Sequence, residues 1–214
     1  MPADYVALGT DPYSAHQLVI KYAAGSRRVL DVGCSAGALA AELSARGAVV
    51  DGIDSDPVAA QEATQHCRKV VVGDLETMQF DFDEEYDVIV LADVLEHLRD
   101  PIALLRRLRP HLAPGGRVVV STPNIANWSM RLLHLAGRWE YAERGIMDRT
   151  HVHFFTRRSL LRAMAAAGYR VRHVDVTAPV PILRRPPYSR VAHWLAMRLQ
   201  GLLAYQFVVE AEAT

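Results

Sequence analysis

The chain has 214 residues, of which 50% are apolar and 22% are charged, and this balance excludes a disordered chain or a fibrous repeat. A chain of this length is predicted to form a single domain with its own core. No apolar run reaches about 18 residues and no basic stretch precedes an apolar one at the N-terminus, so neither a transmembrane helix nor a signal peptide is expected. The only two cysteines, Cys34 and Cys67, predict a reduced, cytoplasmic setting rather than a disulfide framework.

The net charge is zero, with 24 basic and 24 acidic residues, which argues against a globally basic nucleic-acid-binding protein. The charge is divided unevenly, however. Residues 1–100 hold 18 acidic and 7 basic residues, whereas residues 101–214 hold 6 acidic and 17 basic ones. Such asymmetry indicates a charged partner, and it leaves open an anionic substrate on the arginine-rich side.

The first two thirds of the chain alternate short strands with helices. Strands are predicted at Arg28–Val32, Ala48–Ile53, Lys69–Val72, Tyr86–Leu91 and Arg117–Ser121, and helices at 38–46, 56–67 and 101–112. Strands that consist almost entirely of Val, Ile and Leu are buried on both faces, and their alternation with helices predicts right-handed βαβ crossovers. The predicted fold class is therefore α/β, with a doubly wound parallel sheet.

After Ser121 the pattern changes, because residues 122–155 show no clear strand. The elements predicted beyond them are a helix at Thr156–Ala167, a strand at Tyr169–Val176, a loop at 177–187, a helix at Tyr188–Leu203 and a last strand at Ala204–Ala211. The last helix carries an apolar stripe at helical spacing: Val191, Leu195, Leu199 and Leu202. This stripe could pack on the sheet edge, line an apolar substrate pocket or form a basic amphipathic surface that touches a membrane.

Polar residues follow the predicted strand ends, where ligands bind in open parallel sheets. Gly33 and Gly37 allow a tight turn after the first strand, but their spacing differs from Gly-x-Gly-x-x-Gly, which disfavours an NAD-dependent oxidoreductase. Asp54, about 20 residues further on, is placed to accept hydrogen bonds from ribose hydroxyls. Asp74, after the third strand, could bind an adenine amino group. Each carboxylate alone could be a helix cap or a solvated charge, but together they favour a nucleoside-containing ligand.

Five segments carry a resemblance to a known family: VLDVGCSAG, VDGIDSDP, VVGDLE, YDVIVLADVLEHLRDP and LAPGGRVVVSTPN. In order and spacing they resemble class I S-adenosylmethionine-dependent methyltransferases, and most closely small-molecule O-methyltransferases of the ubiquinone-biosynthesis and MetW-like type. The resemblance is strong over residues 25–125 and weak over 150–175. It implies a Rossmann-like seven-stranded sheet of order 3-2-1-4-5-7-6 with strand 7 antiparallel. It also implies S-adenosylmethionine as cofactor and S-adenosylhomocysteine (SAH) as product.

The resemblance further implies which residues surround the cofactor. The loop after the first strand would shape the pocket for the methionine part, through Asp31, Gly33, Cys34, Ser35 and Gly37. Asp54 and Ser55 would bind the ribose, Asp74 and Leu75 the adenine, and the backbone of Ala92 and Asp93 would face the sulfonium. The family often has glycine at the position of Ser35, so slightly less room and an extra hydroxyl contact are expected there.

Methyl transfer needs an aligned nucleophile and a base that takes its proton. His97, just after the fourth strand, is one candidate base, and packing under the following turn is the alternative. Asp148, His151 and His153 form a second candidate set, as base, substrate-binding or metal-binding residues, with a purely structural role as the alternative. A lone His-x-His is weak support for a metal, and no metal is expected.

A single methyltransferase domain is therefore predicted over residues 1–214. Residues 1–25 would form a lid that includes Tyr5, Tyr13 and His16, and residues 124–155 and 177–203 would be substrate-side insertions. The predicted reaction is in-line methyl transfer to a hydroxyl or carboxylate oxygen of a small biosynthetic intermediate. A non-catalytic subunit with this fold and an RNA methyltransferase are the alternatives. No nucleic acid is expected as a partner, because neither an RNA-binding domain nor a motif for a flipped base is evident. An anionic or lipid-linked acceptor and peripheral membrane contact stay open, and the oligomeric state is undefined.

Overall fold

The computed structural model describes residues 11–80, 82, 84–177 and 188–214. The strands are β1 (Arg28–Val32), β2 (Val49–Asp54), β3 (Lys69–Val72), β4 (Tyr86–Ala92), β5 (Leu112–Pro123), β6 (Tyr169–Val176) and β7 (Gln206–Ala213). The helices are α1 (Ala15–Ala23), α2 (Ala38–Ala45), α3 (Pro57–Ala63), α4 (Pro101–Leu108), α5 (Trp128–Leu135), α6 (Arg157–Ala166), α7 (Tyr188–Arg198) and α8 (Gln200–Leu203). Two short 3-10 turns, η1 (Leu95–His97) and η2 (Arg109–His111), flank α4.

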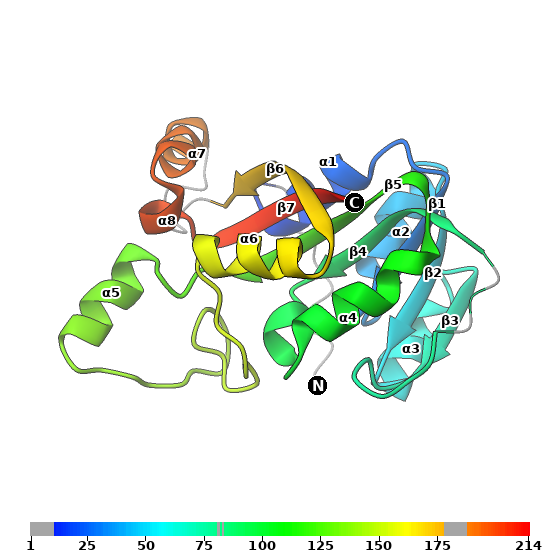
Figure 1. The fold of residues 1–214 in the computed structure, drawn as a ribbon, viewed down its shortest axis with the longest axis horizontal. Coiled ribbons are helices and arrows are strands. Elements are labelled where there is room, and N and C mark those ends of the chain that lie inside the picture. The colour runs from blue at the N-terminus through cyan, green and yellow to red at the C-terminus, as the bar shows by residue number, and fades with distance from the viewer. Residues whose placement is uncertain (1–10, 81, 83, 178–187) are drawn as a thin grey trace.

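All seven strands form one sheet of order β3-β2-β1-β4-β5-β7-β6 (Figure 1). Strands β1 to β5 pair in parallel, and β7 lies antiparallel between β5 and β6. The sheet order and the antiparallel last strand that the resemblance implies are thus confirmed. Because the first five strands are parallel, their carboxyl ends meet at one edge of the sheet, which is where ligands bind in such folds.

Two apolar layers cover the two faces of the sheet. Helices α1, α2 and α3 cover one face and α4 and α6 the other (Figure 1). Alternate strand residues face the two layers, so that Val29 and Val88 lie in one and Leu30 and Ile89 in the other, all fully buried. This two-sided burial explains why the strands read as continuous apolar runs rather than as alternating ones.

Helix starts follow side-chain caps that the sequence carries. The side chains of Asp56, Asp100 and Thr156 accept backbone N–H groups at the starts of α3, α4 and α6. Helix α4 ends at Leu108 rather than at the predicted residue 112, because Pro110 has no N–H to continue the helix and the chain turns into η2. Strand β5 begins earlier than predicted, since Leu112 already pairs with Tyr86 before the register shifts.

Part of the segment predicted as a lid belongs to the core. Leu18, Val19 and Ile20 of α1 are buried against the sheet. The ring of Tyr13, just before α1, stacks on His193 of α7 with 4.2 Å between ring centroids. Tyr5 and the rest of residues 1–10 lie outside the described residues, so a lid there stays a prediction. The same holds for residues 178–187 of the predicted loop.

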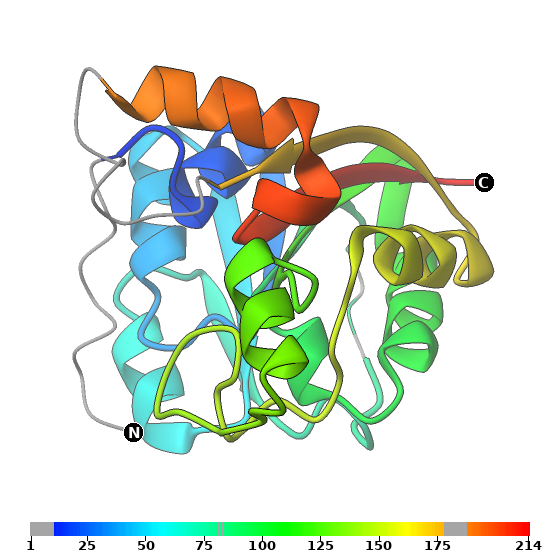
Figure 2. The ribbon, with the colours of Figure 1, turned by 90° about the vertical axis from the view of Figure 1, so that its left-hand side faces the viewer.

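Helices α5, α7 and α8 lie together at one end of the molecule (Figures 1 and 2). No helix is predicted from the sequence at α5, and every residue of this helix is at least partly exposed. Helix α7 buries small residues, among them Ala192 and Ala196, while the apolar stripe at Val191, Leu195, Leu199 and Leu202 is exposed. Helix α7 does pack on the edge strand β6, where Nδ1 of His193 lies 3.0 Å from the Val176 carbonyl. It packs through its small side chains, however, and the large side chains of the stripe point outward. Within the described part of the chain, no helix is long and apolar enough to cross a bilayer.

Candidate active site

The loop between β1 and α2 turns back on the end of β2. The N–H groups of Gly33 and Cys34 donate to the Ile53 carbonyl at 2.7 and 3.0 Å. Gly33 has a φ of +78°, and a Cβ at this position would lie 2.6 Å from Cγ2 of Val94. Both the left-handed backbone and this close approach require glycine at residue 33. The loop therefore presents its backbone at the carboxyl ends of β1, β2 and β4.

Asp54 ties this loop to the second strand. Its Oδ2 accepts the Ser35 N–H at 2.7 Å, and its Oδ1 accepts the Asp56 N–H at 2.9 Å. Ser35 has a φ of +47°, a conformation that costs a non-glycine residue strain, and this charge-assisted hydrogen bond holds it. The exposed Ser55 lies next to this carboxylate in sequence. Each carboxylate oxygen keeps acceptor capacity, so Asp54 can fix the loop and still bind the hydroxyls of a ribose.

Asp31 is a buried carboxyl group with an unsatisfied oxygen. It is 2% exposed, and its Oδ2 has no hydrogen-bond partner among the described residues. Burial, with a contribution from the charge of Asp54, raises the pKa of Asp31 to about 7. Asp51 is equally buried but bonds Arg68 and Tyr86, as a structural carboxylate does. An unpaired buried carboxyl group at a strand end makes Asp31 a candidate to bind a cationic group of a ligand.

The binding of SAH is expected to depend on pH through Asp31. The α-ammonium group of the ligand favours the ionised carboxylate, so the raised pKa penalises binding below about 7. With a free-protein pKa of about 7, SAH should bind roughly tenfold more tightly at pH 8 than at pH 6. Isothermal titration calorimetry at several pH values checks this. Asp31→Asn should bind weakly with a flat pH profile, and a flat profile in the unaltered protein would contradict the assignment.

The remaining residues implied for the cofactor lie in different surroundings. Asp74 is exposed, and its Oδ1 accepts the Glu76 N–H at 2.9 Å, so it also caps its own turn. Leu75 is buried in the core next to it. The Cys34 side chain is buried beside Gly52, where a Cβ would lie 2.7 Å from its Sγ. Cys34 therefore offers the loop surface its backbone rather than its thiol.

Asp93, at the end of β4, is held by two other strands. It has a φ of +56°, and its Oδ1 accepts hydrogen bonds from Ser121 Oγ at 2.7 Å and Gln206 Nε2 at 3.0 Å. Ser121 belongs to β5 and Gln206 begins β7, so these contacts join residues 28 and 113 positions apart in sequence. Ser121 and Gln206 are not among the predicted site residues, because nothing in the local sequence marks them. Together they fix the backbone of Ala92 and Asp93 at the centre of the strand ends.

The structure brings His97 and His151 together beside Asp93. Their rings meet edge to face, with 4.9 Å between centroids. Nδ1 of His97 lies 3.3 Å from the Thr150 carbonyl and Nδ1 of His151 lies 3.1 Å from the Ile146 carbonyl. Since a carbonyl only accepts, Nδ1 carries the hydrogen in each ring and the neutral ring keeps a free lone pair on Nε2. Burial and the neighbouring His151 lower the pKa of His97, which favours this neutral form.

Glu96 completes this cluster and was not among the predicted catalytic residues. It is 2% exposed, and neither carboxyl oxygen has a well-formed hydrogen bond to a described residue. Burial raises its pKa well above the ordinary value, and the nearby charge of Asp93 adds to this. One ligand atom each from Glu96, His97 and His151 lies within 4.8 Å of the others. The trio could share a proton or hold a divalent cation.

Asp148 and His153 play different parts around this cluster. Burial alone would raise the pKa of Asp148, but two hydrogen bonds from Thr150 and the nearby His151 and His97 lower it. Asp148 is therefore a carboxylate that electrostatically supports the two rings. The ring of His153 stacks on Phe155 with 4.8 Å between centroids, and its backbone N–H donates to the Glu96 carbonyl. The structure thus brings Asp148 and His151 to His97 and gives His153 an anchoring role.

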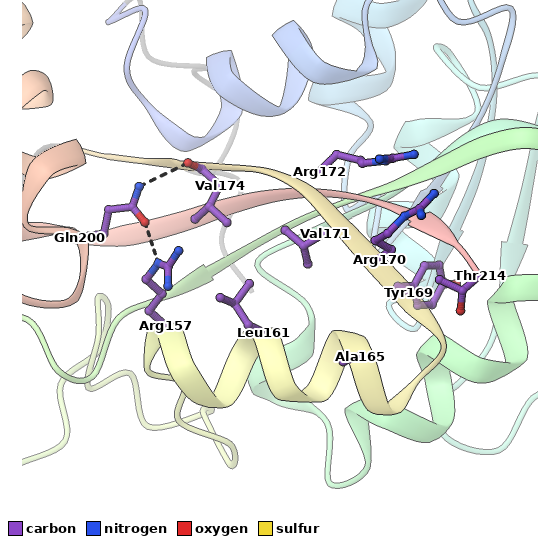
Figure 3. Close-up of a pocket in the computed structure, with 10 residues that line it drawn as sticks. All are labelled: Arg157, Leu161, Ala165, Tyr169, Arg170, Val171, Arg172, Val174, Gln200 and Thr214. Carbon is purple, nitrogen blue, oxygen red and sulfur yellow. Dashed lines mark hydrogen bonds between the residues drawn. The ribbon is translucent and has the colours of Figure 1, made fainter.

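One groove of the described residues lies elsewhere. It has a volume of about 760 Å³ and runs between α6 and the edge strand β6, where Arg157 and Gln200 close one end (Figure 3). None of the residues implied for the cofactor lines it. The candidate active site is instead the set of polar groups at the carboxyl ends of β1, β2 and β4.

The fold is that of a Rossmann-like enzyme, and its strand-end groups form a candidate site for a nucleoside cofactor. The family model of a methyltransferase domain matches residues 11–174. The chain belongs to this methyltransferase family, and its cofactor is S-adenosylmethionine. Three observations fit that cofactor: the loop requires glycine at residue 33, Asp54 keeps acceptor capacity for ribose hydroxyls, and Asp31 has an unpaired oxygen.

Similar proteins agree with this family. The chain is 34% identical over 165 residues to a ubiquinone biosynthesis O-methyltransferase of Aeromonas salmonicida, covering 73% of this chain and 68% of the relative. The solved structure of an S-adenosylmethionine-dependent methyltransferase from Mesorhizobium loti matches with a TM-score of 0.65 and 21% identity, over 95% of this chain and 98% of that one. The magnesium protoporphyrin IX methyltransferase of Synechocystis PCC 6803 with bound SAH gives 0.62 at 17% identity, covering 93% and 83%. At these identities the two structures show the fold alone.

Proposed function

We propose that the enzyme transfers the methyl group to an oxygen, a hydroxyl or a carboxylate, of a small biosynthetic intermediate. The observation that carries this proposal is the pair of rings at His97 and His151, held by backbone carbonyls beside the end of β4. A neutral imidazole with a free Nε2 suits removal of a hydroxyl proton near pH 7. The relatives named ubiquinone biosynthesis O-methyltransferase support oxygen as the acceptor atom.

The chain's own residues have three tasks in this reaction. The bound cofactor supplies an activated methyl group on a sulfonium. Asp31 would bind the α-ammonium group of that ligand and Asp54 its ribose, and the backbone held at Asp93 would set the line along which the acceptor oxygen approaches. Nε2 of His97 or His151 takes the hydroxyl proton as the oxygen–carbon bond forms and the carbon–sulfur bond breaks. The negative charges of Asp148 and Asp93 favour the imidazolium that results at His97. A carboxylate acceptor needs no base, and then the two rings position it.

The chemistry of the acceptor is supported by the composition of the second half of the chain and by its exposed helices. Residues 101–214 hold 17 basic residues and 6 acidic ones, and α5 and α7 expose large apolar side chains at this end of the molecule. Both features support an acceptor that is anionic or attached to a lipid. We place the reaction in the cytoplasm, because free cysteines are typical of a reducing compartment and both cysteines of the chain are free and buried.

A thermal shift and a labelled methyl transfer test this function together. Saturating SAH should stabilise the protein by about 3 kcal/mol at a hundredfold excess over Kd, which corresponds to roughly 5–10 °C in Tm. NAD serves as the control and should give no shift. Methyl-labelled S-adenosylmethionine is then offered with phenols, catechols, aliphatic alcohols and carboxylic acids, and mass spectrometry locates the label. Stabilisation by NAD but not by SAH would refute cofactor binding, and label found only on nitrogen or carbon would refute the oxygen acceptor.

A further inference from the structure

The end of the molecule formed by α5, α7 and α8 exposes large apolar side chains that no described residue covers. We call this surface the apolar end. Its members lie in the two segments 128–139 and 191–202 and are Trp128, Leu132, Leu133, Leu135, Trp139, Val191, Trp194, Leu195, Leu199 and Leu202. All three tryptophans of the chain are among them. Single exposed apolar residues are normal, but a clustered set with tryptophan marks an interaction surface.

The way these helices pack shows that the exposure is built into the fold. Helix α7 turns Ser189, Ala192 and Ala196 toward the protein and Trp194 and Leu195 away from it. A helix that packs only against its own core does the reverse, with its large apolar residues inside. Every residue of α5 is at least partly exposed, and Leu135 near its end is 87% exposed. Both helices therefore present their apolar sides away from the described residues of the chain.

The two segments are joined into one surface by polar contacts between α5 and α8. Nη2 of Arg131 donates to the Gly201 carbonyl at 3.3 Å, and Nδ2 of Asn127 donates to the Ala204 carbonyl at 2.9 Å. Figures 1 and 2 show α5, α7 and α8 at the same end of the molecule from two directions. The apolar end also adjoins the active site, because Trp139 packs on Phe154 and Phe154 packs on His151.

The charge of this surface decides what can cover it. Residues 124–141 and 188–205 contain four arginines, Arg131, Arg138, Arg190 and Arg198, against the single acidic residue Glu140. All four arginines are exposed, and the guanidinium of Arg198 lies over the Trp194 ring, 5.2 Å from its centroid. A second copy docked symmetrically would set arginines against arginines. An anionic lipid surface would neutralise them while it takes up the apolar side chains.

We propose that the apolar end docks reversibly on an anionic lipid bilayer. Tryptophan suits the bilayer interface, since its ring is apolar and its N–H remains near water. The arginines extend past the apolar residues to lipid phosphates. Trp139 contacts Phe154, which in turn contacts His151. Docking through Trp139 therefore turns the acceptor side of the active site toward the bilayer. This docking is independent of the methyl-transfer chemistry, so it is measured without turnover.

The test is co-sedimentation of the full chain with vesicles of phosphatidylglycerol and phosphatidylcholine, compared with phosphatidylcholine alone. The protein should sediment with the anionic vesicles, and added salt should weaken the binding because it screens the arginines. Leu135→Glu and Trp194→Glu should each weaken vesicle binding by about tenfold or more. Each change replaces an apolar side chain that inserts into the bilayer by a carboxylate that anionic lipid repels. Leu135 and Trp194 are 87% and 54% exposed, so neither change disturbs the core.

Val58→Glu is the matched control. Val58 is a 68% exposed apolar residue of α3, which lies away from the apolar end (Figure 1). It should leave vesicle binding unchanged, and SAH binding by calorimetry should be the same in all three variants. Absence of sedimentation with anionic vesicles at low salt would overturn the proposal. Equal weakening by Val58→Glu, or a dimer in solution that Leu135→Glu dissociates without any vesicle binding, would overturn it as well. Loss of SAH binding in the unaltered protein would instead count against the methyltransferase function.

Discussion

Asp54→Ala is expected to abolish tight cofactor binding, weakening the affinity for SAH by about 100-fold or more. The carboxylate offers acceptors to the ribose hydroxyls and also holds the Ser35 N–H at 2.7 Å. Without it, the ribose loses its partner and the strained Ser35 loses the hydrogen bond that holds its φ at +47°. The free loop is then less ordered, so binding must also order it. Isothermal titration calorimetry with SAH measures this loss.

Asp56→Ala provides the matched control, two residues away on the same turn. Asp56 caps α3 by accepting the N–H groups of Val58 and Ala59. Its loss should lower the stability of the protein by about 1 kcal/mol and leave SAH affinity within a few fold. Asp54→Asn, which keeps one acceptor oxygen, should fall between Asp54→Ala and the unaltered protein. If Asp54→Ala binds SAH as tightly as Asp56→Ala does, Asp54 is not the ribose ligand.

One of the two rings, His97 or His151, is expected to be the general base. Replacing that ring by alanine should lower kcat by about 100- to 1000-fold, the usual contribution of a general base. The other ring should have a smaller effect, through the lost contact at 4.9 Å. SAH affinity should stay within about twofold in both variants, since neither ring is placed at the nucleoside or the methionine part. Turnover is measured with an acceptor found in the labelled methyl-transfer screen. Unchanged turnover in both variants would remove the pair from catalysis.

The dependence of turnover on pH gives a second readout for the same pair. The pKa of His97 lies below its ordinary 6.5, so its neutral, proton-accepting form persists to lower pH. Activity should therefore fall only as the pH drops below about 6.5, and His97→Ala should remove or displace this acidic limb. Treatment with EDTA separates a base from a metal ligand. Activity that survives chelation supports a base, whereas activity lost to EDTA and restored by Mg²⁺ assigns Glu96, His97 and His151 to a divalent cation.

Much of the fold follows from local pattern. The strands β1, β3 and β6 begin and end at the predicted residues, because each is a short apolar or alternating run between polar turns. Asp56 and Thr156, residue types that favour helix starts, cap α3 and α6. The sheet order was implied by the resemblance rather than by the pattern. Periodicity alone tells which residues share a helix face but not where that face points, which is why the exposed stripe of α7 was compatible with burial.

The candidate site is predictable where its residues follow strands directly. Asp31 and Asp54 sit at the ends of β1 and β2, so a parallel sheet brings them together. The meeting of His97 with His151 depends on how the segment after α5 folds back, with Val152 and His153 donating their N–H groups to the Glu96 carbonyl. Local sequence does not encode such a contact. Glu96 becomes a candidate only because it is buried without a well-formed hydrogen bond, which a sequence cannot display.

The position of β7 between β5 and β6 determines the order in which the strands can pair during synthesis. Strand β6 pairs only with β7 in this sheet, although it precedes β7 in the chain. A chain emerging from the ribosome can complete β1 to β5 first, but β6 has no neighbour until β7 inserts beside β5. The same insertion delivers Gln206 to Asp93. During synthesis, the half that binds the cofactor can therefore be assembled before the centre where the methyl group is passed on, and that centre is finished only by the last strand.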